Sequence, residues 1–419
     1  MTLLGRVVRL IVLGIMLAGC ATGPLNYDYI PTPVTSTHIE DINRQLRAAG
    51  ISRSFVALDW QGRIELQGEY DDEAAVDQAF SIAQTVVGVR WVSPVTPERI
   101  RVAEWSLCLS NLLSGKACGP PRLASLPSVV AAPGPLMKRY ALIVGIGRFR
   151  NVPGGTLKYA SKDAEDLYRY LIDPHGGNFP EENVILLQNE AATRGAIEAA
   201  LAEMKARLSE DDLFVLYFSS HGTPPDKFGG VHIVTYDTEV KPRERVWRTA
   251  LTEGVLGAFI QETKAKRLVV VMDACYSNGA YAKIPGFLPT GGKSLGLEGE
   301  EGYGRSRVGM VQRLLGAKDL ILVDDNPPSD LGSTASAWGK VLISASDAGE
   351  KSWESDRIRN SFFTHYFIEG LRRGDGRLKE AFEYAKPLVT TGVREEKEAE
   401  QHPQLTPSRR DWHMSLAGL

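Results

Sequence analysis

Apolar and polar residues alternate in blocks along the second half of the chain. Short apolar runs, rich in β-branched and aromatic residues, occupy 140–147, 184–187, 213–220, 268–274 and 340–345. Runs of this kind are typical of strands that are buried on both faces of a parallel sheet. Between and after them, helical patterns are predicted over 160–171, 193–208, 251–262, 362–372 and 378–388. This order predicts an α/β fold in which helices cover a mostly parallel central sheet.

Two of these apolar runs end in reactive side chains. The run from Leu213 leads directly to His221, and the run from Leu268 leads to Cys275, 54 residues later. That separation leaves room for a hairpin around Gly229-Gly230 and one crossover helix, so the two strands can be parallel neighbours. Ligands of open α/β sheets bind beyond the carboxyl ends of the strands. A thiol beside an imidazole is the minimal pair for nucleophilic acyl transfer, although a buried Cys or His taken alone is more often structural.

The residues around both side chains resemble a known family. Ser219-Ser220-His221-Gly222 and Asp273-Ala274-Cys275-Tyr276 are similar to the His and Cys motifs of caspases and metacaspases, in which the His lies roughly 50 residues before the Cys. Metacaspases usually have His where Tyr276 stands, a departure that bears on fine specificity more than on activity. The resemblance extends over 138–410, including Ser361-Phe362-Phe363-Thr364-His365-Tyr366 and Gln401-His402-Pro403-Gln404. It implies a caspase-like α/β/α sandwich over 138–419 and a Cys275–His221 dyad, with the N–H groups of Gly222 and Cys275 as oxyanion hole.

The same resemblance implies a substrate class. Animal caspases hold an Asp side chain before the scissile bond with arginines, whereas metacaspases hold Arg or Lys with carboxylates. Asp163 and Asp273 match the metacaspase carboxylate positions. Two converging carboxylates favour a guanidinium or ammonium guest, so we expect protein or peptide substrates that carry Arg or Lys. The alternative for Asp163 is that it caps its own helix or faces solvent.

The first residues of the chain predict export and lipidation. Arg6 and Arg9 precede the apolar stretch 10–17, which is too short to span a bilayer and reads as a signal peptide over 1–19. Leu17-Ala18-Gly19-Cys20 resembles a lipobox, and Ala21 after it resembles lipoproteins sent to the outer membrane. We therefore expect a lipid-anchored protein of the bacterial cell envelope, held at the outer membrane by Cys20 and facing the periplasm, with 20–37 as a tether. An ordinary signal peptide with a chance Cys is the alternative.

A small α+β domain is expected over 38–97. A helical pattern ends at Gly50, and strands are predicted at 55–58 and 64–70. A second helix is predicted from residue 71, and a third strand at 88–92. This αββαβ order resembles a BON domain, although other small α+β domains share it. The proline-rich stretch 98–137 reads as a linker before the peptidase-like domain.

The four cysteines fit an exported protein. Cys20 is expected to carry lipid, and Cys108 and Cys118 enclose a short loop and can form a disulfide in an oxidising compartment. This leaves Cys275 as the odd thiol, the pattern expected of a reactive cysteine. A reduced or metal-binding Cys108–Cys118 pair is the alternative, but no adjacent His or second CxxC supports metal.

The remaining features exclude some functions and leave one rival. A formal net charge of −3 argues against a nucleic-acid binder, and Gly145-Ile146-Gly147 lacks the third glycine of a dinucleotide loop. The long insert 276–339 is rich in Gly, Ser and Asp and carries Lys and Arg, so self-cleavage there is plausible. Asp324 and Asp325 are candidate calcium ligands, with a solvated loop as the alternative; otherwise no cofactor or metal is expected. A catalytically silent caspase-like scaffold is the rival to a peptidase.

Overall fold

The computed structural model describes residues 34–88, 91–103, 134–228, 230–274, 339–347, 350–406 and 414–417. Six strands form the central sheet in the order β11-β8-β7-β6-β4-β5. β4 (Arg139–Gly145), β5 (Val184–Gln188), β6 (Leu213–Ser219), β7 (Arg267–Asp273) and β8 (Gly339–Ser344) are parallel. They correspond to the five predicted apolar runs. β11 (Gln404–Thr406) adds an antiparallel edge that the sequence pattern did not predict, because three residues carry too little periodicity.

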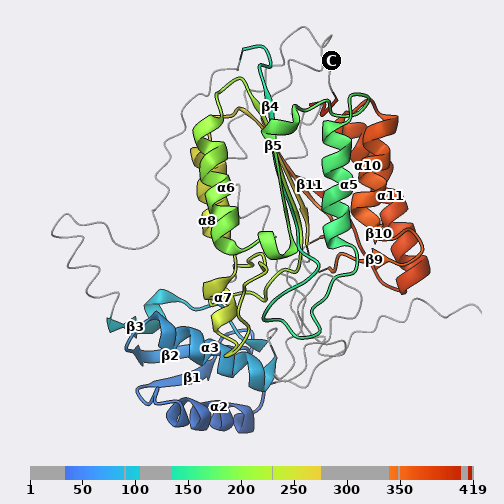
Figure 1. Ribbon diagram of the computed structural model, residues 1–419. Helices are drawn as coiled ribbons and strands as arrows, with labels where there is room; N and C mark the ends of the chain where they lie inside the picture. The colour runs from blue at the N-terminus through green and yellow to red at the C-terminus, as the bar shows by residue number, and fades with distance from the viewer. Residues whose placement is uncertain are drawn as a thin grey trace, which may run out of the picture. The chain divides into compact units, whose positions relative to one another are not determined.

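Helices cover both faces of this sheet, as expected. Figure 1 shows α6 (Arg194–Arg207) and α8 (Glu253–Glu262) on one side, and α5 (Ala160–Ile172), α10 (Phe362–Arg373) and α11 (Leu378–Lys397) on the other. Side chains of β6 alternate between the two layers: Phe214, Leu216 and Phe218 enter the α6/α8 core, whereas Val215 and Tyr217 enter the α5/α10/α11 core. The chain therefore has the predicted α/β/α sandwich, with two apolar cores separated by the sheet.

Helix ends follow the sequence closely with two differences. Thr193 caps α6, as predicted, by accepting a hydrogen bond from the Ala196 N–H (3.2 Å). α11 continues past its predicted end at Leu388 and contains Pro387, because Val389 and Val393 still face the core. The short helix α7 (Arg245–Thr249) was not predicted, since five residues cannot display a helical repeat.

A small α+β unit precedes the large domain. It consists of α2 (Ser36–Ala48), β1 (Ser54–Leu58), β2 (Ile64–Tyr70), α3 (Glu73–Val87) and β3 (Ile100–Val102), with β2 antiparallel to β1 and parallel to β3. The predicted third strand at 88–92 is not found at its described residues, 88, 91 and 92. Val92 makes only an isolated bridge to Ile64, and β3 begins after Pro94 and Pro97, which interrupt strand pairing. The sheet of this unit thus extends past the predicted limit at 97.

The connection from β6 to β7 makes a short antiparallel arrangement before α7 and α8. Gly222 bridges Ile233, and Ile233 bridges Leu251. The Asp226 N–H bonds to the Gly230 carbonyl (2.8 Å), so the chain reverses near the predicted hairpin position. Two further short strands, β9 (Glu354–Ser355) and β10 (Asn360–Ser361), lead into α10.

Several predicted features lie outside the described residues. They are the signal peptide, Cys20, the Cys108–Cys118 loop, Cys275 and residues 276–338 of the insert, with Asp324 and Asp325. Within the described ranges, no helix is both long enough and apolar enough to cross a membrane.

Candidate active site

The two strands that lead to His221 and Cys275 are direct neighbours. β6 and β7 pair in parallel along their whole length, and their last residues, Ser219 and Asp273, stand opposite each other. His221 therefore follows one strand end by two residues, and Cys275 follows the adjacent strand end by two residues. Cys275 itself is outside the described residues, while Ala274 before it is fully buried.

His221 is fully buried, and its orientation is fixed by contacts on several sides. Its Nε2 lies 2.7 Å from the carbonyl oxygen of Gly155, and the Phe149 ring packs with its centroid 5.1 Å from the imidazole centroid. The Val234 N–H donates to the His221 carbonyl (2.9 Å). A carbonyl only accepts, so Nε2 carries the hydrogen in the neutral ring and Nδ1 carries the lone pair. His221 is therefore held in the tautomer whose Nδ1 can accept a proton.

The glycines that follow β4 have a packing role. A Cβ at Gly145 would lie 2.4 Å from the Ala164 Cβ, and one at Gly147 would lie 2.6 Å from the Leu157 carbonyl oxygen. These positions allow α5 and the 146–159 loop to approach the end of β4. This loop carries the Gly155 carbonyl that orients His221.

Asp163 is fully buried, so the alternative in which it faces solvent is wrong. Its Oδ1 accepts from the Ser361 backbone N–H (2.9 Å), and its Oδ2 accepts from Ser219 Oγ (3.2 Å). Asp163 thus links α5 to the end of β6 and to the N-cap of α10.

Asp273 is also fully buried and converges on the same region. Ser352 Oγ donates to its Oδ1 (2.6 Å), Thr364 Oγ1 donates to its Oδ2 (2.6 Å), and Ser361 Oγ also donates to Oδ2. Both aspartates therefore bond to Ser361, one through its backbone and one through its hydroxyl. The sequence-predicted carboxylates meet at the start of α10, where the N-terminal end of the helix favours negative charge.

Tyr217 lies next to this cluster, and the two aspartates affect the pKa of its phenol. Its Oη lies 2.6 Å from Thr364 Oγ1. Because Thr364 gives its single hydroxyl hydrogen to Asp273, Tyr217 is the donor in this pair. Burial, together with the nearby Asp163 and Asp273, raises the pKa of Tyr217 well above its usual value. The phenol consequently stays protonated and supports Asp273 through Thr364.

Several of these contacting residues were not assigned a role from the sequence. They are Gly155, Tyr217, Ser219, Ser352, Ser361 and Thr364. The Ser361–Tyr366 phrase was noted only as part of the family resemblance. Ser361 has the residue type and position of an N-cap, the one local signal that could have drawn attention to it.

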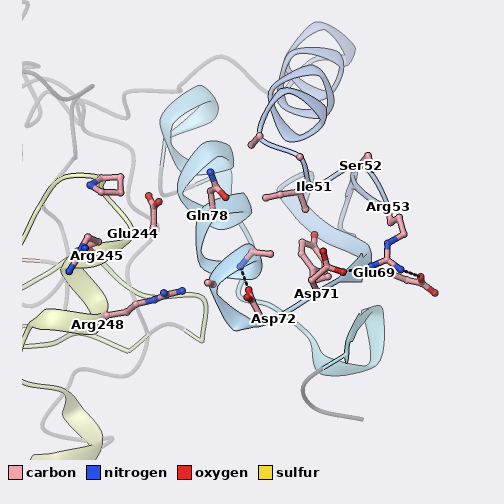
Figure 2. A pocket seen from close by; sticks show the side chains of 16 residues that line it. Ile51, Ser52, Arg53, Glu69, Asp71, Asp72, Gln78, Glu244, Arg245 and Arg248 are labelled. Atoms are coloured by element: carbon pink, nitrogen blue, oxygen red, sulfur yellow. Dashed lines mark hydrogen bonds and ion pairs between the residues drawn. The ribbon is translucent and has the colours of Figure 1, made fainter. Parts of the chain in front are cut away.

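A separate cavity of about 420 Å³ is lined by none of the residues at the strand ends (Figure 2). Its arginines Arg53, Arg245 and Arg248 each form an ion pair with a carboxylate. These three arginine charges are therefore paired within the chain. In the described part of the protein, no group of three or more His, Cys, Asp or Glu side chains could hold a metal ion.

Comparisons with known proteins identify one family over the larger, C-terminal part of the chain. The caspase-domain family model matches residues 138–411. A protein from Geobacter sulfurreducens is 18% identical, with a TM-score of 0.43, over 68% of this chain and 100% of that one. Caspase-1 from Spodoptera frugiperda is 15% identical, with a TM-score of 0.39, over 71% and 100%. A search of curated proteins finds no match. Because the family match spans more than half of the sequence, this chain belongs to the caspase-domain family, peptidase C14.

Proposed function

We propose that this chain is a cysteine endopeptidase that cuts after Arg or Lys by means of Cys275 and His221. The observation that carries the proposal is the convergence of Asp163 and Asp273 on Ser361, beside the strand that leads to Cys275. Membership of the caspase-domain family supports a peptidase that acts on proteins.

His221 has the tautomer that the reaction needs. Its Nδ1 takes the thiol proton of Cys275, and the resulting thiolate attacks the substrate carbonyl. The imidazolium then protonates the leaving amine, which leaves an acyl group on the cysteine. Water, deprotonated by the same Nδ1, releases the acid and regenerates the thiol. The Gly155 carbonyl keeps the ring oriented throughout by accepting the Nε2 hydrogen.

Gly222 is suited to stabilise the oxyanion. The hydrogen bonds that pair its segment with 232–234 are made by the Thr223 and Val234 N–H groups. The Gly222 N–H consequently points away from 232–234, as expected for the residue between two such bonds in an antiparallel pair. Together with the Cys275 N–H it forms the proposed oxyanion hole.

The two carboxylates account for the proposed preference for a cation. Placing two buried aspartates around one residue is costly unless their charge is balanced. Hydroxyl and backbone N–H groups are among the donors to these carboxylates, and they spread the negative charge. A guanidinium or ammonium group of the substrate supplies the opposite charge.

We also propose that the chain is a lipoprotein of the bacterial outer membrane, facing the periplasm, and that its small N-terminal unit is BON-like. The support is the Leu17-Ala18-Gly19-Cys20 junction and the order of elements in the small unit.

Hydrolysis of short fluorogenic peptides that end in Arg, Lys or Asp tests the enzymatic proposal. The wild type should cleave the Arg and Lys peptides, and Cys275→Ala should cleave none. If the wild type cleaves no peptide or protein, the chain is better explained as a catalytically silent scaffold.

A further inference from the structure

The segment that follows His221 and Gly222 is held from outside the large domain. The Lys227 carbonyl accepts from the Val95 N–H (2.7 Å), and the Pro225 carbonyl accepts from Gln84 Nε2 (3.4 Å). Val95 and Gln84 both belong to the small N-terminal unit. The Pro224 carbonyl accepts from Trp247 Nε1 (3.2 Å), and the Trp247 ring meets Phe80 of α3 edge to face. The path from the catalytic His to this unit is therefore only a few residues long.

A buried ion pair also links the loop to the small unit. Lys227 Nζ lies 2.6 Å from Asp77 Oδ1, and the side chains of Lys227 and Asp77 are only 8% and 7% exposed. Asp77 Oδ2 also accepts from Nε and Nη2 of Arg248, each at 3.2 Å. A buried carboxylate without its cation is strongly unfavourable, so such a pair fixes one arrangement of the two segments.

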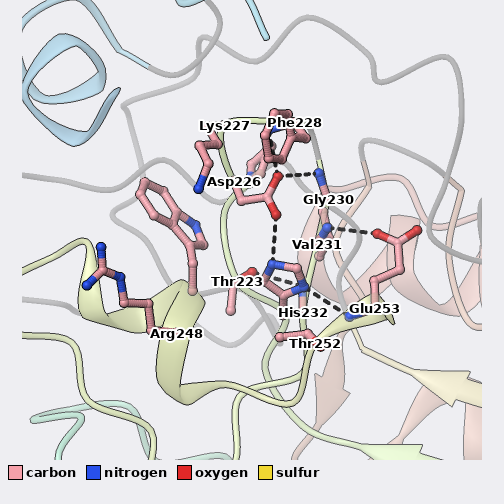
Figure 3. Close-up of polar contacts among 12 residues, drawn as sticks. Thr223, Asp226, Lys227, Phe228, Gly230, Val231, His232, Arg248, Thr252 and Glu253 are labelled. Atoms are coloured by element: carbon pink, nitrogen blue, oxygen red, sulfur yellow. Dashed lines mark hydrogen bonds and ion pairs between the residues drawn. The ribbon is translucent and has the colours of Figure 1, made fainter. Parts of the chain in front are cut away.

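The loop between Gly222 and Ile233 is braced internally (Figure 3). Asp226 accepts from the N–H groups of Phe228 and Gly230 (2.8 Å each) and from His232 Nε2 (3.0 Å). His232 in turn bonds to Thr223 through both its N–H and its carbonyl. Lys227 thus belongs to a loop that is held by its own hydrogen bonds and begins at Gly222 and Thr223. A displacement of Lys227 would therefore also move Gly222 and Thr223.

We propose that Asp77 of α3 is a positioning residue for the peptidase reaction. By holding Lys227 and Arg248, it fixes the 223–232 loop and so aims the Gly222 N–H at the reacting carbonyl. The small N-terminal unit then contributes to catalysis by holding the loop after Gly222 in place. This inference rests on the proposed function, because the oxyanion role of Gly222 does.

The expected signature is a change in kcat with little change in KM. An oxyanion donor contacts the charge that develops in the transition state, and losing one outright costs roughly 10²–10³ in kcat. Asp77→Asn displaces the donor without removing it, so we expect a loss of about tenfold. The pocket formed by Asp163 and Asp273 is untouched, which leaves KM for Arg peptides within about twofold.

The experiment compares four variants of the full chain: Asp77→Asn, Lys227→Met, the double variant of these two, and Asp72→Ala as a matched control. Asp72 caps the same helix through the Ala75 N–H (2.8 Å) and has no described contact with the loop. The double variant should lose no more kcat than the more damaging of the two single variants, because the Lys227–Asp77 contact is already broken in each of them. Asp72→Ala should keep wild-type kcat while lowering thermal stability.

Hydrogen exchange at the Thr223 and Val234 amides gives a second readout that needs no turnover. Exchange should accelerate in Asp77→Asn and Lys227→Met and stay slow in Asp72→Ala. Wild-type kcat together with unchanged exchange in Asp77→Asn would overturn the inference while leaving the peptidase proposal standing. A wild type that cleaves no peptide would overturn the peptidase proposal and, with it, the catalytic role of Asp77.

Discussion

Neutralising one pocket carboxylate is the sharpest perturbation of specificity. Asp163→Asn keeps the shape of the side chain, and its amide oxygen can still accept from the Ser361 N–H, but the charge is lost. Truncating one partner of a buried charge pair costs about 2–5 kcal/mol of binding. At about 1.4 kcal/mol per tenfold, kcat/KM for Arg peptides should therefore fall roughly 30-fold to several thousand-fold.

The fold should survive this change. Among the described contacts, Asp163→Asn takes one acceptor from the Ser219 hydroxyl, a penalty of about 1–3 kcal/mol. The free energy of unfolding of a native domain is about 5–15 kcal/mol. Thermal unfolding should therefore remain cooperative, with a lowered midpoint.

A neutral analogue of arginine separates charge from shape. Peptides that carry citrulline in place of Arg fit the same space without a positive charge, so Asp163→Asn should change their slow cleavage far less than it changes Arg cleavage. Asp273→Asn should behave in the same way, with a larger stability loss because three hydroxyls donate to Asp273. If both folded variants cleave Arg peptides at the wild-type rate, or if the wild type prefers Asp peptides, the pocket assignment is wrong.

Three other predictions concern cysteines and acid stability. In the folded, unreduced protein, a thiol-directed alkylator should label Cys275 alone, and labelling of Cys108 or Cys118 in mass mapping would refute their disulfide. Cys20→Ser should leave the protein uncleaved at its signal or soluble in the periplasm, and unchanged membrane fractionation would contradict lipidation. Burial alone would raise the pKa of Asp226, but hydrogen bonds from His232 and two backbone N–H groups lower it. A carboxyl group whose pKa is lowered on folding stabilises the fold at pH values above its ordinary pKa of about 4. This stabilisation is lost as the pH falls from there through the lowered pKa. Asp226→Asn should therefore flatten the stability–pH curve below about pH 4, whereas a curve that keeps its wild-type slope would refute this role.

The sequence predicted those parts of the fold whose signal is local. β6 and β7 are buried along their whole length, and their composition alone marked them as central strands. The third strand of the small unit was predicted at 88–92 because Val89, Trp91 and Val92 favour strands, while the residues that do pair with β2, Ile100–Val102, follow two prolines.

The strand pattern alone placed His221 and Cys275 after neighbouring strands, whereas the two carboxylates came from the family resemblance and their hydrogen-bond donors were not predicted. The donors to Asp273 come from positions 79, 88 and 91 residues further along the chain. Lys227 and Asp77 are 150 residues apart. Periodicity says nothing about pairs at such separations, because they are set by the way whole elements pack.

Covalent labelling tests the central claim most directly. A peptidyl-arginine acyloxymethyl ketone should add once to the folded chain, and mass spectrometry should locate the adduct on Cys275. The Cys275→Ala variant should remain unmodified, Asp163→Asn should react much more slowly, and the corresponding aspartate reagent should react poorly with the wild type. An adduct on another residue, or equal labelling by the arginine and aspartate reagents, would contradict a Cys275 peptidase with a carboxylate pocket.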